Sequence, residues 1–155
     1  MNKYRQHGLA TVEFAIVGAV LLMLIIGVIE VGRAFFVASA LDEATRRGAR
    51  MAAVCPINDP AIAQAAAFNN ALIFGLDASD IVVEYLDDSA GVVGNPADPA
   101  EFITIEFVRV RVVGFQHQMF IPLVAALSQF TMPEYATMLP RESLGIPRTG
   151  FITPC

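Results

Sequence analysis

A single apolar stretch near the N-terminus constrains the fold of this chain more than any other feature. Residues 9–29 are almost wholly apolar, and only Thr11 and Glu13 interrupt them. As an α-helix they would extend about 31 Å, which matches the hydrocarbon thickness of a bilayer. Only 16% of the chain is charged, against about a quarter in a soluble domain. We therefore expect one transmembrane helix, with the lipid bilayer as a partner.

The helical pattern continues after the membrane stretch. Small and apolar side chains recur at spacings of three and four residues along one face, namely Val31, Phe35, Ala38, Leu41, Thr45, Gly48 and Ala52. Pro56 is expected to end this helix at about Cys55. An apolar stripe outside the membrane has to be covered, so we expect a folded domain to pack against residues 30–55.

The remaining residues, 56–155, predict a small domain that contains both helix and sheet. Asp59 is a good N-cap, Pro60 suits the first turn of a helix and Gly75 suits a C′ position. A second helix is therefore expected between Pro60 and Gly75. Residues 81–86 are rich in β-branched and aromatic side chains, which predicts the first strand.

Two further strands are expected. Residues 102–113 have the strongest strand pattern, and a change of phase in their alternation predicts a β-bulge near Phe107. Residues 135–139 predict a third strand, which Pro133 and Pro140 would confine to a sheet edge.

The apolar residues 115–130 are too short for a second span and contain Pro122, so we expect a crossover with a short helix at 123–127. The predicted fold class is α+β. A long N-terminal helix, transmembrane in its first half, packs on a small antiparallel three-stranded sheet with a second helix.

The most informative motif lies at the start of the apolar stretch, where residues 8–14 read Gly-Leu-Ala-Thr-Val-Glu-Phe. A short basic leader ends in Gly8, Glu13 follows five residues later, and Phe14 comes next. A peptidase that acts at the membrane face needs a small residue before the scissile bond, and Gly8 has no side chain to block its approach. A carboxylate at mid-membrane costs roughly 3 kcal/mol by insertion scales. Glu13 therefore needs a partner.

This motif resembles the cleavage site of type IV prepilins, and the Glu13 and Phe14 pair resembles the Flp and tight-adherence (Tad) branch. The C-terminal region is similar to that of TadE- and TadG-like minor pseudopilins at residues 108–112, 120–123 and 136–139. The major Flp pilin is far shorter than this chain. The resemblance therefore implies a minor pilin or pseudopilin that serves assembly of a Flp-type pilus.

In that family a membrane-embedded prepilin peptidase cuts after the glycine, so the resemblance implies cleavage after Gly8 and a new N-terminus at Leu9. The Leu9 amine could pair with Glu13 of its own helix, because residues four apart share a helix face. It could equally meet Glu13 of a neighbouring subunit. The partners implied are the peptidase, other Flp/Tad pilins and pseudopilins, and the inner-membrane pilus assembly platform.

The same resemblance implies a single-pass inner-membrane protein with a cytoplasmic N-terminus, a periplasmic C-terminal domain and possible incorporation into a pilus. The expected division of the chain is a leader peptide at 1–8, a transmembrane helix at 9–29, an extramembrane continuation of that helix at 30–55 and a small α+β domain at 56–155.

The chain has two cysteines, Cys55 and Cys155, which are too few for a zinc site of four ligands. The histidines that would complete such a site, His7 and His117, lie on opposite sides of the predicted membrane. In an oxidising compartment two cysteines favour a disulfide, and two unrelated thiols are the alternative. No metal and no cofactor is expected.

The sequence also argues against an enzyme and against nucleic-acid binding. The net charge is −5, and the basic cluster at 46–50 does not form the basic face that nucleic acid requires. There is no G-x-S-x-G, H-E-x-x-H or Walker motif. Glu84 and Glu106 could face each other on neighbouring strands, but solvent-facing strand carboxylates are the usual explanation.

Three alternatives remain at this stage. Glu13 could reach the headgroups by snorkelling. Residues 38–40, Ala-Ser-Ala, fit a signal-peptide cleavage site, although the apolar region is too long for one and Glu30 and Arg33 make a poor flank. The chain could also be an unprocessed single-pass adaptor of an envelope complex. The mature N-terminus separates these possibilities.

Overall fold

The structure is a computed structural model that describes residues 4–119, 129–146 and 155, with side chains from residue 9 onward. The chain divides into two compact units, Met1–Phe36 and Val37–Cys155. The α-helix α1, Tyr4–Val54, provides all the described residues of the first unit and the first element of the second.

The first unit consists of the apolar part of α1. Most of its described side chains are exposed, as Leu9 at 75% and Val28 at 74% illustrate, and Glu30 is buried. The most apolar window of α1 has a mean hydropathy of 2.8, and in the described chain α1 is the one helix long and apolar enough to cross a membrane. A helix that is apolar all round requires either a protein core or lipid. No protein core surrounds this window, so α1 is suited to membrane anchoring.

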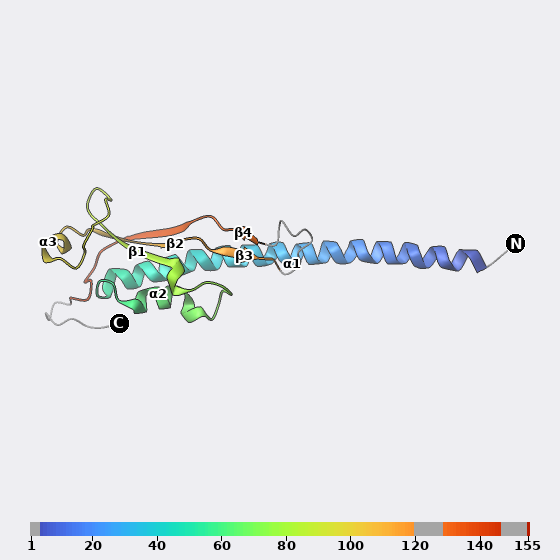
Figure 1. Cartoon of the computed structure of the whole chain (residues 1–155), viewed down its shortest axis with the longest axis horizontal. Helices are drawn as coiled ribbons and strands as arrows, with labels where there is room; N and C mark the ends of the chain where they lie inside the picture. The colour runs from blue at the N-terminus through green and yellow to red at the C-terminus, as the bar shows by residue number, and fades with distance from the viewer. Residues whose placement is uncertain (1–3, 120–128, 147–154) are drawn as a thin grey trace. The chain divides into compact units, whose positions relative to one another are not determined.

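The second unit is α+β, and its sheet has the order β1-β2-β5 with both pairs antiparallel. Figure 1 shows the three strands side by side along the end of α1. Their bounds are Ile81–Leu86 for β1, Phe107–Val112 for β2 and Tyr135–Pro140 for β5. The three predicted strands are therefore present, and β5 lies at a sheet edge as the flanking prolines predicted.

One face of α1 is buried against this sheet, as the periodic stripe predicted. Its buried residues in the second unit are Ala40, Leu41, Ala44, Thr45, Gly48, Ala49, Ala52 and Ala53. At Gly48 a Cβ atom would lie 2.9 Å from both Val110 Cγ1 and Ala66 Cβ, so only glycine allows this close approach. The stripe is shorter than predicted, because Val31 and Phe35 are 56% and 71% exposed.

The second helix, α2, begins where the capping residues predicted but ends early. It spans Pro60–Ala66, and the Asp59 carboxylate accepts a hydrogen bond from the Ala61 N–H at 2.9 Å. The prediction that it continues toward Gly75 is wrong. Three successive residues have positive φ, which reverses the chain in the 3₁₀ turn η1, Phe68–Asn70.

The predicted start of the second strand is wrong, whereas the bulge predicted near Phe107 is supported. The short helix α3, Pro99–Phe102, and the turn after it occupy the first part of that segment. The β1–β2 register runs without a slip from Ile81 opposite Val112 to Leu86 opposite Phe107. The Glu106 N–H also donates to the Leu86 carbonyl at 2.8 Å, and Ile105 and Val108 are both buried. Two residues of the second strand therefore face Leu86, as a bulge near Phe107 predicts.

The remaining elements are the 3₁₀ turn η2, Ala78–Asp80, and two short antiparallel strands, β3 at Gln116–Gln118 and β4 at Gln129–Thr131. The β3–β4 pair was not predicted, since three-residue polar strands carry little periodicity. The helix expected at 123–127 lies outside the described residues.

Candidate processing and assembly segment

The residues of the predicted processing motif, 8–14, lie on consecutive turns of α1. The backbone is helical at Gly8, and the side chains of Leu9, Glu13 and Phe14 are all exposed. Leu9 and Glu13 are four residues apart and therefore share one face of the helix. Phe14, exposed at 79%, projects from the neighbouring position.

The Glu13 carboxylate is exposed on an otherwise apolar part of α1, and this environment determines which partners it can bind. In the described part of the chain no hydrogen bond or ion pair engages Glu13. In lipid, such a group is stable only if it reaches a polar headgroup or a cation. The helix thus presents an acceptor for a positive charge within an otherwise apolar surface.

A second pair of charges, which sequence reasoning did not pair, lies at the other end of the apolar stretch. Arg33 Nη1 is 2.5 Å from Glu30 Oε1, three residues earlier on α1. An i, i+3 spacing of opposite charges was the available signal. These two charges neutralise each other, whereas Glu13 has no such neighbour at i±3 or i±4.

The end of α1 is held by the C-terminal part of the chain. The Glu142 and Leu144 N–H groups donate to the Ala53 carbonyl at 3.0 and 3.3 Å, and the Gly145 N–H donates to the Val54 carbonyl at 2.6 Å. These bonds satisfy carbonyls that the last turn of a helix leaves without partners.

A disulfide between Cys55 and Cys155 adds a covalent tie at the same place, with the two Cα atoms 5.8 Å apart. The Cys155 N–H also donates to Asp59 Oδ2 at 3.4 Å. The chain end is therefore fixed next to the end of α1 and the start of α2.

The outer face of the sheet carries an ionic network. Glu84 binds Arg109 at 2.6 Å and Arg111 at 2.8 Å, and Arg111 also binds Glu134 at 2.8 Å. The hydrogen bond that Arg111 donates to Glu134 raises the pKa of Arg111 above its ordinary value; burial opposes this effect and the Glu84 carboxylate adds to it. The considered pairing of Glu84 with Glu106 is not observed, because Glu106 precedes β2.

Other candidate groups are accounted for by packing. His117 is buried, and its ring is tilted against Phe130 with the centroids 5.1 Å apart. Among the described residues no group of three histidine, cysteine or carboxylate side chains is placed to hold a metal ion.

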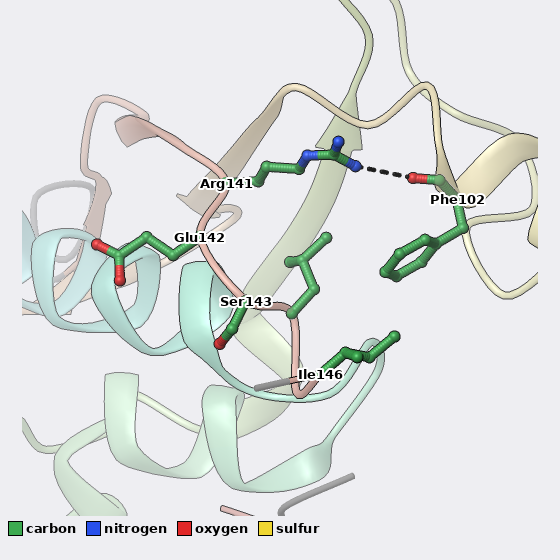
Figure 2. A pocket seen from close by; sticks show the side chains of 6 residues that line it. Phe102, Arg141, Glu142, Ser143 and Ile146 are labelled. Carbon is green, nitrogen blue, oxygen red and sulfur yellow. Dashed lines mark hydrogen bonds between the residues drawn. The ribbon is translucent and has the colours of Figure 1, made fainter. Parts of the chain in front are cut away.

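A small hollow of about 270 Å³ lies beside the segment that follows β5 (Figure 2). Its lining residues are Phe102, Arg141, Glu142, Ser143, Leu144 and Ile146. Arg141 Nη1 donates to the Phe102 carbonyl at 3.1 Å, at the end of α3, and Figure 2 shows the Glu142 carboxylate directed away from it. The Arg141 guanidinium therefore binds a backbone carbonyl at the end of α3. The hollow does not place an acidic and a basic side chain next to each other.

The family comparison falls on the N-terminal segment. A family model described as TadE-like protein matches residues 8–50. Residues 8–50 are TadE-like. The match confirms the resemblance that the motif indicated, and it connects the chain with the Tad pilus system. No curated protein and no solved structure matches the chain significantly.

The TadE-like segment begins at Gly8 and includes Leu9, Glu13 and Phe14, as well as the Glu30–Arg33 pair. It ends at Arg50, so the sheet and both cysteines lie outside the matched residues. TadE-like pilus components are not known as enzymes.

Proposed function

We propose that this chain is a minor pilin or pseudopilin for assembly of a Flp-type (Tad) pilus, and that a prepilin peptidase processes it after Gly8. The observation that carries the proposal is the position of Glu13. It is exposed on an apolar helix, five residues after Gly8, within the TadE-like segment.

In the proposed mechanism, cleavage creates a cation next to Glu13. The free amine of Leu9 lies one helical turn from the carboxylate, and both are exposed on α1. A subunit that leaves lipid for an assembly can pair its own Glu13 with the Leu9 amine of a neighbour. Because lipid is as apolar as a helix surface, this charge pair supplies a register that apolar contacts alone do not.

The proposed topology follows from the same assignment. Residues 1–8 are the cytoplasmic leader, 9–29 the span, 30–55 the extramembrane part of α1 and 56–155 the periplasmic domain. The Cys55–Cys155 disulfide supports an oxidising compartment for the last of these. The proposed partners are the peptidase, other Flp/Tad pilins and the inner-membrane assembly platform.

Intact-mass analysis of the membrane-extracted protein tests the processing step. We expect a mature chain that begins at Leu9 in cells with an active prepilin peptidase, and a Gly8→Val variant that keeps residues 1–8. Gly18→Val is the matched control, because no atom lies within 4 Å of a Cβ at that position and cleavage should proceed.

A wild-type chain that retains residues 1–8 in those cells would show that the protein is an unprocessed membrane adaptor. A chain that begins at Leu41 would show that the N-terminal segment is a signal peptide.

A further inference from the structure

Phe74 is the most exposed large apolar side chain in the described part of the chain, at 88%. It lies at the tip of a β-turn, which the Leu76 N–H closes by donating to the Ile73 carbonyl at 3.3 Å. Gly75 follows it with a φ of +83°, as the third position of a type II turn requires. Ile73 and Leu76 are buried on either side of the tip. The core therefore holds the turn, and the turn presents the Phe74 ring outward as a fixed projection.

The surroundings of this projection leave room for a partner. A Cβ atom at Gly75 would meet no atom within 4 Å, so nothing crowds the backbone beside Phe74. Residues 68–76 contain no charged side chain, and Leu72 adds apolar surface next to the tip with an exposure of 47%. A partner that covers Phe74 would therefore bury apolar surface without burying a charge.

The hollow beside the segment after β5 has the size and the chemistry to receive one aromatic side chain. Its volume of about 270 Å³ lies below the roughly 300–1,000 Å³ of pockets that bind small molecules. Figure 2 shows Phe102, Arg141 and Ile146 around the same space. Phe102 and Ile146 supply apolar walls, and the Arg141 guanidinium attracts the face of an aromatic ring that lies within about 6 Å. The Glu142 carboxylate is directed away and does not compete for that guanidinium.

We propose that Phe74 of one copy of this chain inserts into the hollow of a second copy, between Phe102, Arg141 and Ile146. Phe74 does not fill the hollow of its own chain, because its ring is 88% exposed. The same unit thus carries an apolar projection and, elsewhere on its surface, a hollow that suits it. The complementarity of these two features identifies a second copy as the occupant.

The contact is heterologous, because it joins two different surfaces of the two copies. Each pair keeps one unused projection and one unused hollow, so further copies add in the same way and form an open row or a ring. Both surfaces belong to the second unit, Val37–Cys155. The proposal therefore depends neither on how that unit lies relative to the membrane-anchoring part of α1 nor on cleavage after Gly8.

A complementation experiment with the full-length chain tests the two surfaces separately. Phe74→Ser removes the projection, Ile146→Glu fills the hollow with a carboxylate next to Arg141, and copies with two different tags are co-purified in detergent. When both copies carry the same substitution, recovery of the pair should fall at least several fold. A Phe74→Ser copy mixed with an Ile146→Glu copy should recover the pair, because one intact projection still meets one intact hollow. This recovery also shows that both variants fold.

Val92→Ser is the matched control, because Val92 is also an exposed apolar side chain of the second unit, at 59%, and lies outside both surfaces. Copies that carry it should co-purify like wild type. Undiminished recovery with Phe74→Ser in both copies overturns the proposal. Failure of the mixed pair to recover overturns it as well.

Photo-cross-linking in membranes identifies what Phe74 contacts. p-Benzoylphenylalanine at position 74 keeps an aromatic ring, and irradiation is followed by mass spectrometry of the cross-linked peptides. We expect products with residue 102 or with residues 141–146 of a second, differently tagged copy, and their loss when that copy carries Ile146→Glu. Products formed only with lipid, with the same chain, with another protein or with other residues of the second copy overturn the proposal. The mature N-terminus is determined on the same samples, so this contact and the proposed processing can fail independently.

Discussion

The hydroxyl of Thr45 on α1 lies 2.8 Å from the hydroxyl of Thr137 on β5, and it also donates to the Asp42 carbonyl at 2.8 Å. Each threonine hydroxyl has one proton. Because Thr45 gives its proton to Asp42, Thr137 must be the donor to Thr45. This bond fixes the strand against a fully buried position of the helix.

The first prediction concerns that bond. Thr45→Val should lower the free energy of unfolding by about 1–3 kcal/mol, because Thr137 loses its acceptor and Asp42 loses its donor inside the protein. Thr137→Val should cost less, since Thr45 keeps its bond to Asp42. Chemical denaturation of the full chain in detergent measures both, and the double variant gives their coupling. A coupling of zero would mean that the two hydroxyls do not interact in solution.

The second prediction concerns Gly145, whose φ is +80° and whose Cβ atom would lie 2.7 Å from Pro56 Cα. Gly145→Ala should destabilise the fold by about 2–4 kcal/mol, from left-handed strain and from overpacking together. Gly114 is the matched control, because its φ is +71° and a Cβ there meets nothing within 4 Å. Gly114→Ala should therefore cost only about 1–2 kcal/mol in thermal or denaturant unfolding. Equal losses for both would show that the contact with Pro56 is not close.

The local signals of the sequence predicted those elements that depend on a few neighbouring residues. The β-branched run of β1 gave the correct bounds, and Pro133 and Pro140 correctly indicated an edge strand. The Asp59 cap also predicted the start of α2. Processing residues can be read in the same way, because Gly8 to Phe14 form a linear motif; their roles stay predictions.

Features that depend on tertiary contacts could not be predicted. The end of α2 requires positive φ at Phe68, where the ring packs on the core and the Arg47 guanidinium lies 5.7 Å from its centroid. No local propensity indicates such a turn at phenylalanine. The Glu84–Arg109 ion pair likewise depends on the register between β1 and β2. This register could not be inferred from the sequence of either strand.

The third prediction concerns alkaline pH. Burial raises the pKa of the Tyr85 phenol above 10.0; the Asn58 N–H bond opposes this effect and the Asp59 carboxylate adds to it. A group whose pKa is higher in the folded state contributes stability below its unfolded pKa and loses it as the pH rises through the folded value. Stability should therefore fall from about pH 10 upward, and more steeply in wild type than in Tyr85→Phe. Thermal unfolding at several pH values measures the difference, and parallel curves would exclude a buried phenol.

The fourth prediction concerns the disulfide, whose cysteines are 100 residues apart in sequence. In the chain-entropy model its loss should reduce stability by roughly 4–5 kcal/mol. A variant with both Cys55→Ala and Cys155→Ala should unfold like the reduced wild type. Thiol titration of the unfolded, unreduced protein provides an independent check. Two titratable thiols would show that the bond does not form in the cell.

The fifth prediction concerns Glu13, on which the proposed mechanism depends. Glu13→Leu should leave membrane insertion intact or improve it, because the substitution removes a charge whose cost in lipid is about 3 kcal/mol at mid-membrane. Cleavage after Gly8 should also continue, since the leader and the glycine are unchanged. Assembly should fail, because a neighbouring subunit's Leu9 amine would then lack its acceptor. Co-purification with the other pilins should fall, and adherence that depends on the pilus should be lost.

The matched variants show whether charge is the cause. Glu13→Asp keeps a carboxylate on the same face of α1 and should restore part of the assembly, whereas Glu13→Gln keeps the size but not the charge and should behave like leucine. All three are expressed in a strain that lacks the native gene, and membrane level, processing and pilus assembly are scored together. If Glu13→Leu assembles as well as wild type, the carboxylate only reaches the headgroups. The register of the subunits must then come from contacts elsewhere in the chain.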